Sequence, residues 1–416
     1  MYDIYLKSIK IESLRHLKNV TIPISDSRKK NLIITGKNGS GKTSLLKAIT
    51  EQLNYLTTQG DFDELMGIIS NFERTMQMLK KRGASDNELA NINERIQRNK
   101  RRLADALQGI SLEFNVPENG IKSHFDEGSF IVAFYEADRK FDAIIPTHVE
   151  KVNLKDNYMI TESPRNDFVK YILDLKMTEA LAKSAEKEDK ALKIQKWFLG
   201  FEKVLKKIFQ DDSTTLCFNE ETFGFSIKQS DNKEFSFQEL SDGYAAVLDI
   251  VVDLMVRMEK HNNGIFNFDL PGIVLIDEIE THLHLELQRN VLDLLTALFP
   301  NIQFIISTHS PFVISSANNA TLYDLENKTL VSDGLTNLPY DGIVTGYFQA
   351  DNLSKQLREK FDSYKSLVSK KNLSDDDMNT IAELELYLDE IPDYLALDVT
   401  TEYRRLKTEF DNREDF

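Results

Sequence analysis

Cysteine is almost absent from this chain of 416 residues, which contains only Cys217. One thiol cannot form an internal disulfide, and it cannot build a cysteine cluster for a metal ion. A lone cysteine usually behaves as a small apolar side chain in the protein interior. We therefore expect Cys217 to be buried and inert.

Long apolar runs are absent too. The run around Gly272 to Ile276 is far shorter than the roughly 18 to 20 residues that a membrane-spanning helix needs. The N-terminal stretch "MYDIYLKSIKIESLRHL" alternates apolar and polar residues as a strand does, and it lacks the basic and apolar blocks of a signal peptide. We expect a cytoplasmic protein with no membrane partner.

An excess of positive charge is missing as well, because the formal net charge is −16. Such a field repels nucleic acid at long range, so any contact with DNA or RNA requires a local basic patch. With 41% hydrophobic and 28% charged residues and few glycines and prolines, the composition is typical of soluble globular proteins. The length allows one large domain or two ordinary ones.

A glycine-rich loop, "GKNGSGKT" at residues 36–43, lies between the apolar strand "NLIIT" and the helix-like "TSLLKAITEQL". Glycines let backbone amides point at phosphates, and the following helix adds the positive end of its dipole. Lys42 is expected to reach the β- and γ-phosphates, and the Thr43 hydroxyl is expected to ligate Mg²⁺. The predicted nucleotide-binding residues of this loop are Gly36, Lys37, Asn38, Gly39, Ser40, Gly41, Lys42, Thr43 and Ser44.

Two later strands end in residues suited to phosphate chemistry. The strand "IVLIDE" presents Asp277, which can hold Mg²⁺, and Glu278, which can orient and deprotonate a water. The next strand ends in "STHS", where His309 could contact the γ-phosphate, although a lone histidine is more often structural. The helix-like "ELQRNVLDLLTAL" between them is the crossover that parallel strands require. His282 and His284 lack the further ligands that a metal site needs.

The stretch "LSDGYAAVL", residues 240–248, has two interpretations. A Ser-Asp-Gly turn before an apolar helix is fully explained as a helix cap. The same stretch nevertheless lies upstream of the Asp-Glu strand in a chain that already carries the phosphate loop. That order is the order of ABC-type ATPases.

The remaining segments are predicted to be mostly helical. Between 57 and 110, apolar residues repeat with heptad spacing on both sides of "RGASDN", which predicts an antiparallel hairpin. Its "KKR" and "RNKRR" runs are nearly balanced by acids, which favours a solvated face over a contact for DNA or an acidic partner. Residues 111–145 and 214–237 are predicted as strands, 175–210 as helix, and the chain after about 341 as charged helices.

These motifs together resemble those of ABC-class ATPases of the RecF, SMC and OLD type. "LSDGY" resembles the ABC signature, "DEIETHLHLELQ" the acidic stretch of this class, and "STHSP" its switch-histidine loop. "IESLRHLKNV" resembles the N-terminal element that brings an arginine, here Arg15, to the nucleotide. Arg139 in "YEADRKF" matches an arginine often found before the helical lobe.

The resemblance implies an α/β ABC-type P-loop ATPase head with a mixed sheet, an inserted helical hairpin and a helical C-terminal tail. The domains expected are the ATPase at 1–340, with inserts at 57–110 and 175–210, and a helical region at 341–416 that docks a partner. It also implies a Mg²⁺-dependent ATPase that works as a head-to-tail dimer. Ser241, Asp242 and Gly243 of one subunit would complete the site that contains the catalytic Glu278 and His309 of the other.

For the biological role, the chain most resembles the ATPase subunits of Septu-type and retron-associated anti-phage systems. That resemblance implies a regulatory subunit that controls a separately encoded nuclease or toxin, with nucleic acid or a reverse transcriptase and its RNA as further possible partners. The alternative is a DNA-repair or recombination ATPase of the RecF or SMC kind. A nuclease within the chain is not expected, because the segment after Pro339 is too short and too helical for a Toprim domain.

Overall fold

The structure of the protein is a computed structural model that describes residues 3–58, 62–139, 141, 146–230, 233–262, 266–331, 355–370, 373–389 and 397–411. The chain divides into two compact units, residues 1–338 and 339–416. The predicted boundary between residues 340 and 341 falls outside the described residues. Within the part described, no helix is long and apolar enough to cross a membrane.

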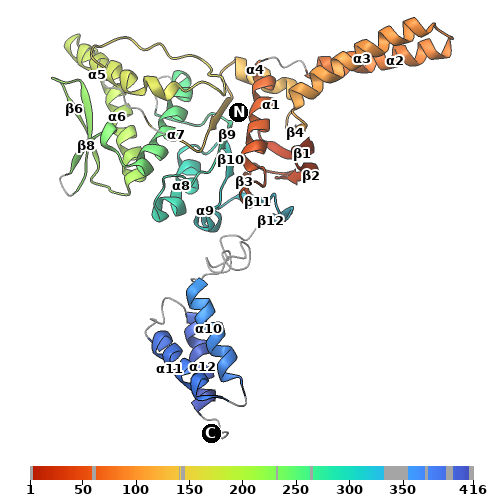
Figure 1. The fold of residues 1–416 in the computed structure, drawn as a ribbon. Helices are drawn as coiled ribbons and strands as arrows, with labels where there is room; N and C mark the ends of the chain where they lie inside the picture. Colours follow the sequence, from red (N-terminus) through yellow and green to blue (C-terminus); the bar gives the residue numbers. More distant parts are fainter. Residues whose placement is uncertain are drawn as a thin grey trace. The chain divides into compact units, whose positions relative to one another are not determined.

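A central six-stranded sheet organises the first unit (Figure 1). In spatial order its strands are β12 (Thr329–Val331), β11 (Ala320–Asp324), β3 (Asn31–Thr35), β10 (Ile302–Ser307), β9 (Gly272–Ile276) and β5 (Ile131–Tyr135). All pairs are parallel except β11 with β12. Because β3, β9 and β10 are buried on both faces, they consist mainly of apolar residues. Strand β10 separates β3 from β9, and the polar residues that follow all three lie at one edge.

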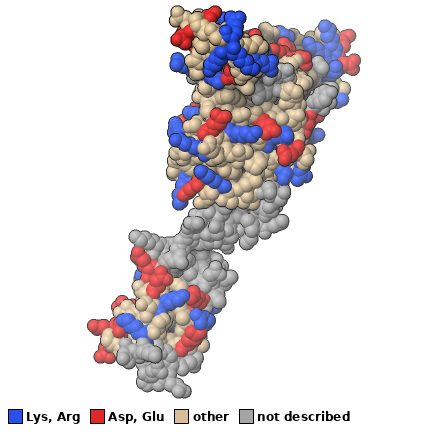
Figure 2. Space-filling model, turned by 90° about the vertical axis from the view of Figure 1, so that its right-hand side faces the viewer, with Lys and Arg blue, Asp and Glu red and all other residues tan. Residues whose placement is uncertain are grey.

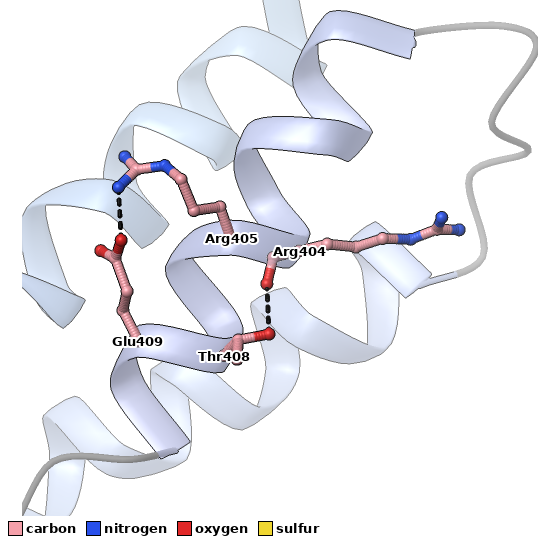
Figure 3. A pocket seen from close by; sticks show the side chains of 4 residues that line it. All are labelled: Arg404, Arg405, Thr408 and Glu409. Carbon is pink, nitrogen blue, oxygen red and sulfur yellow. Dashed lines mark hydrogen bonds and ion pairs between the residues drawn. The ribbon is translucent and has the colours of Figure 1, made fainter.

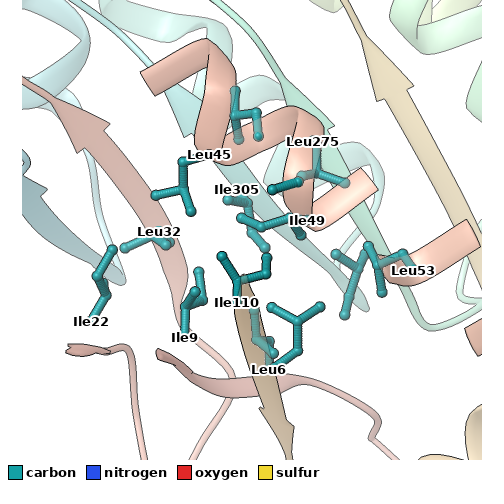
Figure 4. Packing of buried hydrophobic residues seen from close by; sticks show 14 of the residues in the cluster. Leu6, Ile9, Ile22, Leu32, Leu45, Ile49, Leu53, Ile110, Leu275 and Ile305 are labelled. Carbon is teal, nitrogen blue, oxygen red and sulfur yellow. The ribbon is translucent and has the colours of Figure 1, made fainter. Parts of the chain in front are cut away.

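Helix α1 (Lys42–Thr58) follows the glycine-rich loop and contributes to the main core. The core also includes a second, antiparallel sheet of β2 (Leu17–Pro23), β1 (Leu6–Leu14) and β4 (Ile110–Phe114). In Figure 4, Leu45, Ile49 and Leu53 of α1 meet side chains of both sheets in one cluster. Each fully buried leucine or isoleucine contributes about 1.5 to 3 kcal/mol. This packing fixes where α1 begins, and with it the loop before it.

A helical hairpin of α2 (Phe62–Lys81) and α3 (Asp86–Leu107) extends away from the two sheets (Figure 1). Ser85 starts α3 with a reciprocal capping box to Glu88. Helix α2 packs along α3, and the heptad residues Leu65, Ile69 and Ile96 are buried. The hairpin points toward the viewer in Figure 2, where basic and acidic side chains are intermixed. The hairpin surface therefore carries charges of both signs.

The other elements of this unit form a helical lobe and the layers beside the sheet. They are α4 (Glu118–Asp126), η1 (Pro164–Asp167), α5 (Phe168–Ser184), α6 (Glu188–Phe209), β6 (Thr215–Asn219), β7 (Gly224–Lys228), β8 (Glu234–Ser236), η2 (Phe237–Glu239), α7 (Asp242–Glu259), η3 (Lys260–Asn262), α8 (Leu285–Leu298) and α9 (Pro311–Ser316). Strands β6, β7 and β8 make a small antiparallel sheet. Most of α7 is buried, as its apolar sequence requires.

Two expectations were wrong in detail. Cys217 is only partly buried, because it lies on β6 at the edge of the small sheet. The stretch 111–145 contains helix α4 between strands β4 and β5, where only strands were expected. Helix α4 includes Gly120, which weakens the helical pattern of its sequence.

Charged side chains on α7 form a buried network with the segment around Arg165. Asp253 accepts hydrogen bonds from Tyr135 at 2.8 Å and from Arg257 at 2.7 Å. Arg165 Nε lies 2.7 Å from Asp249 Oδ1, yet neither oxygen of that fully buried carboxylate accepts a well-aligned hydrogen bond. Burial raises the pKa of the Asp249 carboxyl to about 7, against the attraction of Arg165. The folded protein therefore holds this proton more tightly than the unfolded chain does.

The Asp249 carboxyl gives a pH prediction. An unfolded aspartate has a pKa of about 3.9, so between about pH 4 and 7 the folded state binds the extra proton and stability falls as pH rises. Asparagine does not titrate in this range, so Asp249→Asn should lack about 2 to 4 kcal/mol of the loss in unfolding free energy that the original protein shows as pH rises. Thermal unfolding of both proteins at acidic and at slightly alkaline pH measures it. Equal pH dependence in the two proteins would contradict the assignment.

The second unit consists of α10 (Lys355–Val368), α11 (Asp375–Asp389) and α12 (Leu397–Asp411). Its own apolar core contains Phe361, Tyr364, Val368, Ile381, Leu384, Leu388, Tyr403, Leu406 and Phe410. A shallow hollow on α12 is lined by Arg404, Arg405, Thr408 and Glu409 (Figure 3). The bonds drawn there join Arg405 to Glu409 and Thr408 to the Arg404 carbonyl, so both lie within one helix. This unit therefore has a core that does not depend on the first.

Candidate nucleotide-binding site

The glycine-rich loop has a backbone that other residues could not adopt. Gly36 has φ +134° and Gly41 has φ +100°, both in the region that favours glycine. A Cβ at Gly36 would lie 2.9 Å from Ser40 Oγ, and one at Gly41 would lie 3.3 Å from His16 Cε1. The loop is therefore tightly wound at the N-terminus of α1, where backbone amides and the helix dipole favour an anion.

Lys42 lies in the first turn of α1 and is largely buried. Its ammonium group donates hydrogen bonds to the carbonyl oxygens of Gly36, at 2.8 Å, and Lys37, at 3.3 Å. Burial lowers the pKa of Lys42, and the carboxylates of Glu278 and Asp277 oppose that change. The ammonium is held inside the loop, in reach of any group that the loop surrounds.

The acidic pair follows β9 directly. Asp277 is 4% exposed, and its carboxylate accepts a hydrogen bond from the Ser307 hydroxyl at the end of β10. The same hydroxyl oxygen accepts the backbone N–H of Glu278 at 2.8 Å. Glu278 has φ +44°, a left-handed conformation that is rare for a residue with a Cβ. The turn after β9 is thus an unusual backbone fixed by its neighbours.

His309 follows β10 and is half-buried beside Lys42 and the acidic turn. Its backbone N–H donates to the Glu280 carboxylate. Burial and then the positive charge of Lys42 lower the pKa of the His309 imidazole. The neutral ring is therefore favoured, and it can donate or accept a hydrogen bond toward a ligand.

These side chains surround one cavity of about 210 Å³ at the edge of the central sheet. It is lined by Arg15, His16, Asn38, Gly39, Gly41, Lys42, Thr43, Ser44, Glu278 and His309. Nine of the predicted site residues are in that lining, whereas Gly36, Lys37, Ser40 and Asp277 are not. Lys37 instead forms an ion pair with Glu326 at 2.9 Å. The structure brings together residues that are up to 294 positions apart in the sequence, Arg15 and His309.

The signature-like residues lie outside this cavity. Ser241 is exposed at the N-cap position of α7, and its side chain makes no capping hydrogen bond. Gly243 is buried, and a Cβ there would lie 2.9 Å from the His282 carbonyl oxygen. Tyr244 packs on Phe209 with ring centroids 4.6 Å apart. The glycine is therefore required by packing within the chain, whereas the side chain of the exposed serine makes no hydrogen bond among the residues that the structure describes.

Three residues near the cavity were not predicted. His16 lines it, and its Nε2 lies 3.0 Å from the Ser40 carbonyl oxygen. Ser307 bonds both acidic residues, and Glu280 holds the backbone at His309. His16 had no signal in the sequence beyond its place beside Arg15, whereas Ser307 belongs to "STHSP" and Glu280 to "DEIETHLHLELQ".

The fold and the site together define a class. The phosphate loop lies between a buried parallel strand and its helix. An acidic pair follows a second strand, and a third strand lies between these two. This arrangement is an α/β fold of the P-loop ATPase type. Residues 32–315 match the family model described as "AAA domain, putative AbiEii toxin, Type IV TA system". The match covers more than half of the chain, and the chain belongs to this family. The predicted fold class is confirmed.

Individual relatives agree with the resemblance drawn from the motifs. The "Septu protein PtuA" of Bacillus mycoides (strain KBAB4) is 26% identical over 382 residues, which are 88% of this chain and 48% of that protein. The "Retron Ec83 probable ATPase" of Escherichia coli is 34% identical over 160 residues, 36% of this chain and 29% of that protein. The chain thus spans about half the length of the first relative and less of the second. The resemblance to Septu and retron ATPases is confirmed.

Among solved structures, an SMC head bound to the C-terminal winged-helix domain of ScpA matches with 16% sequence identity and a TM-score of 0.38. The match covers 77% of this chain and 93% of that one.

Proposed function

We propose that this protein binds and hydrolyses ATP in the cavity at the edge of the central sheet. The observation that carries the proposal is that Lys42, Glu278 and His309 line one space beside a loop suited to phosphate. ATP supplies the phosphates, Glu278 accepts a proton from the attacking water, and His309 contacts the γ-phosphate. Arg15, at the turn between β1 and β2, also lines the cavity and would contact the nucleotide.

Magnesium fits the residues present. Thr43 lines the cavity, and the buried Asp277 directly follows β9. Oxygen donors of this kind suit Mg²⁺, which also takes oxygens from substrate phosphates. Bound there, the ion would neutralise charge that develops on the phosphates. Clusters of three or more His, Cys, Asp or Glu able to hold a metal do not occur among the described residues, so this ion would depend on the nucleotide for further ligands.

The direct test is phosphate release by the purified protein. We expect release from ATP in the presence of Mg²⁺ and loss of that activity when EDTA removes the ion. ATP binding without release would reduce the proposal to a nucleotide switch. Absence of ATP binding in calorimetry would overturn it.

We also propose that ATP joins two copies head to tail. Ser241, Asp242 and Gly243 of one copy would complete the site that contains the other copy's Lys42 and Glu278. The exposure of Ser241 and its lack of a capping bond support this, because its hydroxyl remains available to another molecule. The similarity to ABC-type motifs supplies the head-to-tail arrangement.

The similarity to Septu and retron ATPases supports a role in anti-phage defence. In this proposal the ATP-bound dimer restrains or positions a separately encoded nuclease or toxin, with nucleic acid or a reverse transcriptase and its RNA as further possible partners. The tail helices α10 to α12 would dock the effector, since they have a core of their own. Copurification with the product of a neighbouring gene tests this role, and strong DNA binding without such a partner would argue for DNA repair instead.

Removal of residues 342–416 separates the two proposed activities. Because the first unit has its own core, we expect the shortened chain to retain ATP affinity within about threefold. We expect it to lose the copurifying effector. Nucleotide titration and a pull-down against the full-length chain measure both. Loss of ATP binding would show that the tail is part of the ATPase, and an unchanged pull-down would place the effector elsewhere.

A further inference from the structure

Arg139 makes an unusual set of contacts behind the acidic turn. It follows β5, is 4% exposed, and donates to the carbonyl oxygens of three consecutive residues. The distances are 2.7 Å to Asp277, 3.0 Å to Glu278 and 3.3 Å to Ile279. A fourth bond, at 2.9 Å, reaches the Glu136 carbonyl oxygen. Its planar guanidinium group therefore spans the whole turn that follows β9.

This turn needs to be held. Glu278 adopts φ +44°, and a residue with a Cβ keeps such a backbone only where its surroundings fix it. The Ser307 hydroxyl accepts the backbone N–H of Glu278. Arg139 donates to the carbonyl oxygen of Glu278 and to those of the residues before and after it. The direction of the Glu278 side chain into the cavity follows from these peptide planes.

An ordinary buried arginine would pair with a carboxylate in direct contact. Arg139 instead directs its hydrogen bonds to carbonyl oxygens, and its Nε has no hydrogen-bond partner in the part of the chain that the structure describes. Among carboxylates, Asp249 on α7 exerts the strongest attraction on it. Asp249 thus attracts Arg139 without bonding it, and the geometry of the contacts is set by the acidic turn.

We propose that Arg139 is a positioning residue for Glu278, which it holds in the left-handed conformation that aims the carboxylate at the water attacking ATP. The proposal rests on the ATPase function proposed above. Arg139 does not line the cavity, so it acts through Glu278 and not on the nucleotide. Substituting it should slow hydrolysis without weakening the binding of ATP.

The test is a double-mutant cycle of Arg139→Ala and Glu278→Gln, measured by ATP turnover and nucleotide titration. Arg139→Ala alone should lower kcat by at least about tenfold and leave the ATP dissociation constant within about threefold. Combined with Glu278→Gln it should cause little further loss, because both changes remove the same function. Arg139→Lys, which can bond one carbonyl group at a time, should restore part of kcat.

Other outcomes would overturn the proposal. One is a double variant whose loss of kcat is the product of the two single losses. Another is an Arg139→Ala variant with unchanged kcat, whether or not its ATP affinity is weakened. Should Arg139→Ala fail to fold, the same cycle with Arg139→Lys decides by the same criteria. Arg165→Ala is the matched control, since it removes an arginine of the helical lobe that is paired with Asp249 and bonds no residue of the acidic turn. It should lower the unfolding temperature and show no such dependence on Glu278. An unmodified protein without turnover would refute the ATPase function itself.

Discussion

Glu278→Gln is expected to lower ATP turnover by about 10²- to 10⁴-fold, the usual contribution of a general base. The glutamine has nearly the same shape and can still accept the weak contact from Thr281, but it cannot take a proton from water. Because Lys42 and the phosphate loop are untouched, ATP affinity should remain within about threefold of the original. Single-turnover phosphate release and nucleotide titration measure the two effects separately.

Two controls make this result specific. Lys42→Ala should lose ATP binding itself, since the ammonium held in the loop is removed. Glu286→Gln, a change of an exposed carboxylate in the first turn of α8, should leave turnover unchanged. Turnover by Glu278→Gln at the original rate would assign the base to another residue, and loss of ATP binding would make Glu278 a binding residue.

Ser241→Arg is expected to abolish ATP-driven pairing while leaving the fold intact. Replacing an N-cap serine usually costs about 1 kcal/mol, but here the side chain makes no capping bond, so the cost should be smaller. A large cation at this exposed position would clash with the second copy. The variant should remain monomeric with ATP by light scattering, and its turnover should fall by about tenfold or more because each site lacks its second half.

Mixing tests whether the two halves come from different molecules. Lys42→Ala should be inactive and Ser241→Arg strongly impaired, yet their mixture can form one intact site from the Lys42 of one copy and the Ser241 of the other. We expect turnover to return to at most about half of the original level. A mixture as inactive as its components would place both residues in the same copy's site.

The sequence was informative where short-range chemistry decides the structure. The stretches 31–35 and 272–276 form buried parallel strands. A short apolar run of about five residues is typical of a strand that is covered on both faces of its sheet. The glycines of the phosphate loop fix its conformation locally through their positive φ. These features predict Lys42 at the start of a helix and Glu278 and His309 just after strands, as the structure has them.

Long-range pairing decided the rest. No local pattern specifies that β10 lies between β3 and β9, or that the β1–β2 turn brings His16 to the phosphate loop. The role of Ser307 as a common partner of both acidic residues depends on that strand order. The partial exposure of Cys217 follows from its position on the edge strand of the small sheet. Such properties belong to the tertiary arrangement.

Whether ATP pairs two copies is decided by the mass of Glu278→Gln in solution with ATP and Mg²⁺. With ATP we expect about twice the mass of one chain. We expect the mass of one chain without nucleotide, and also with ATP when Ser241→Arg is added. A variant that binds ATP and keeps the mass of a single chain would contradict it. So would a dimer that forms equally well without nucleotide or with Ser241→Arg.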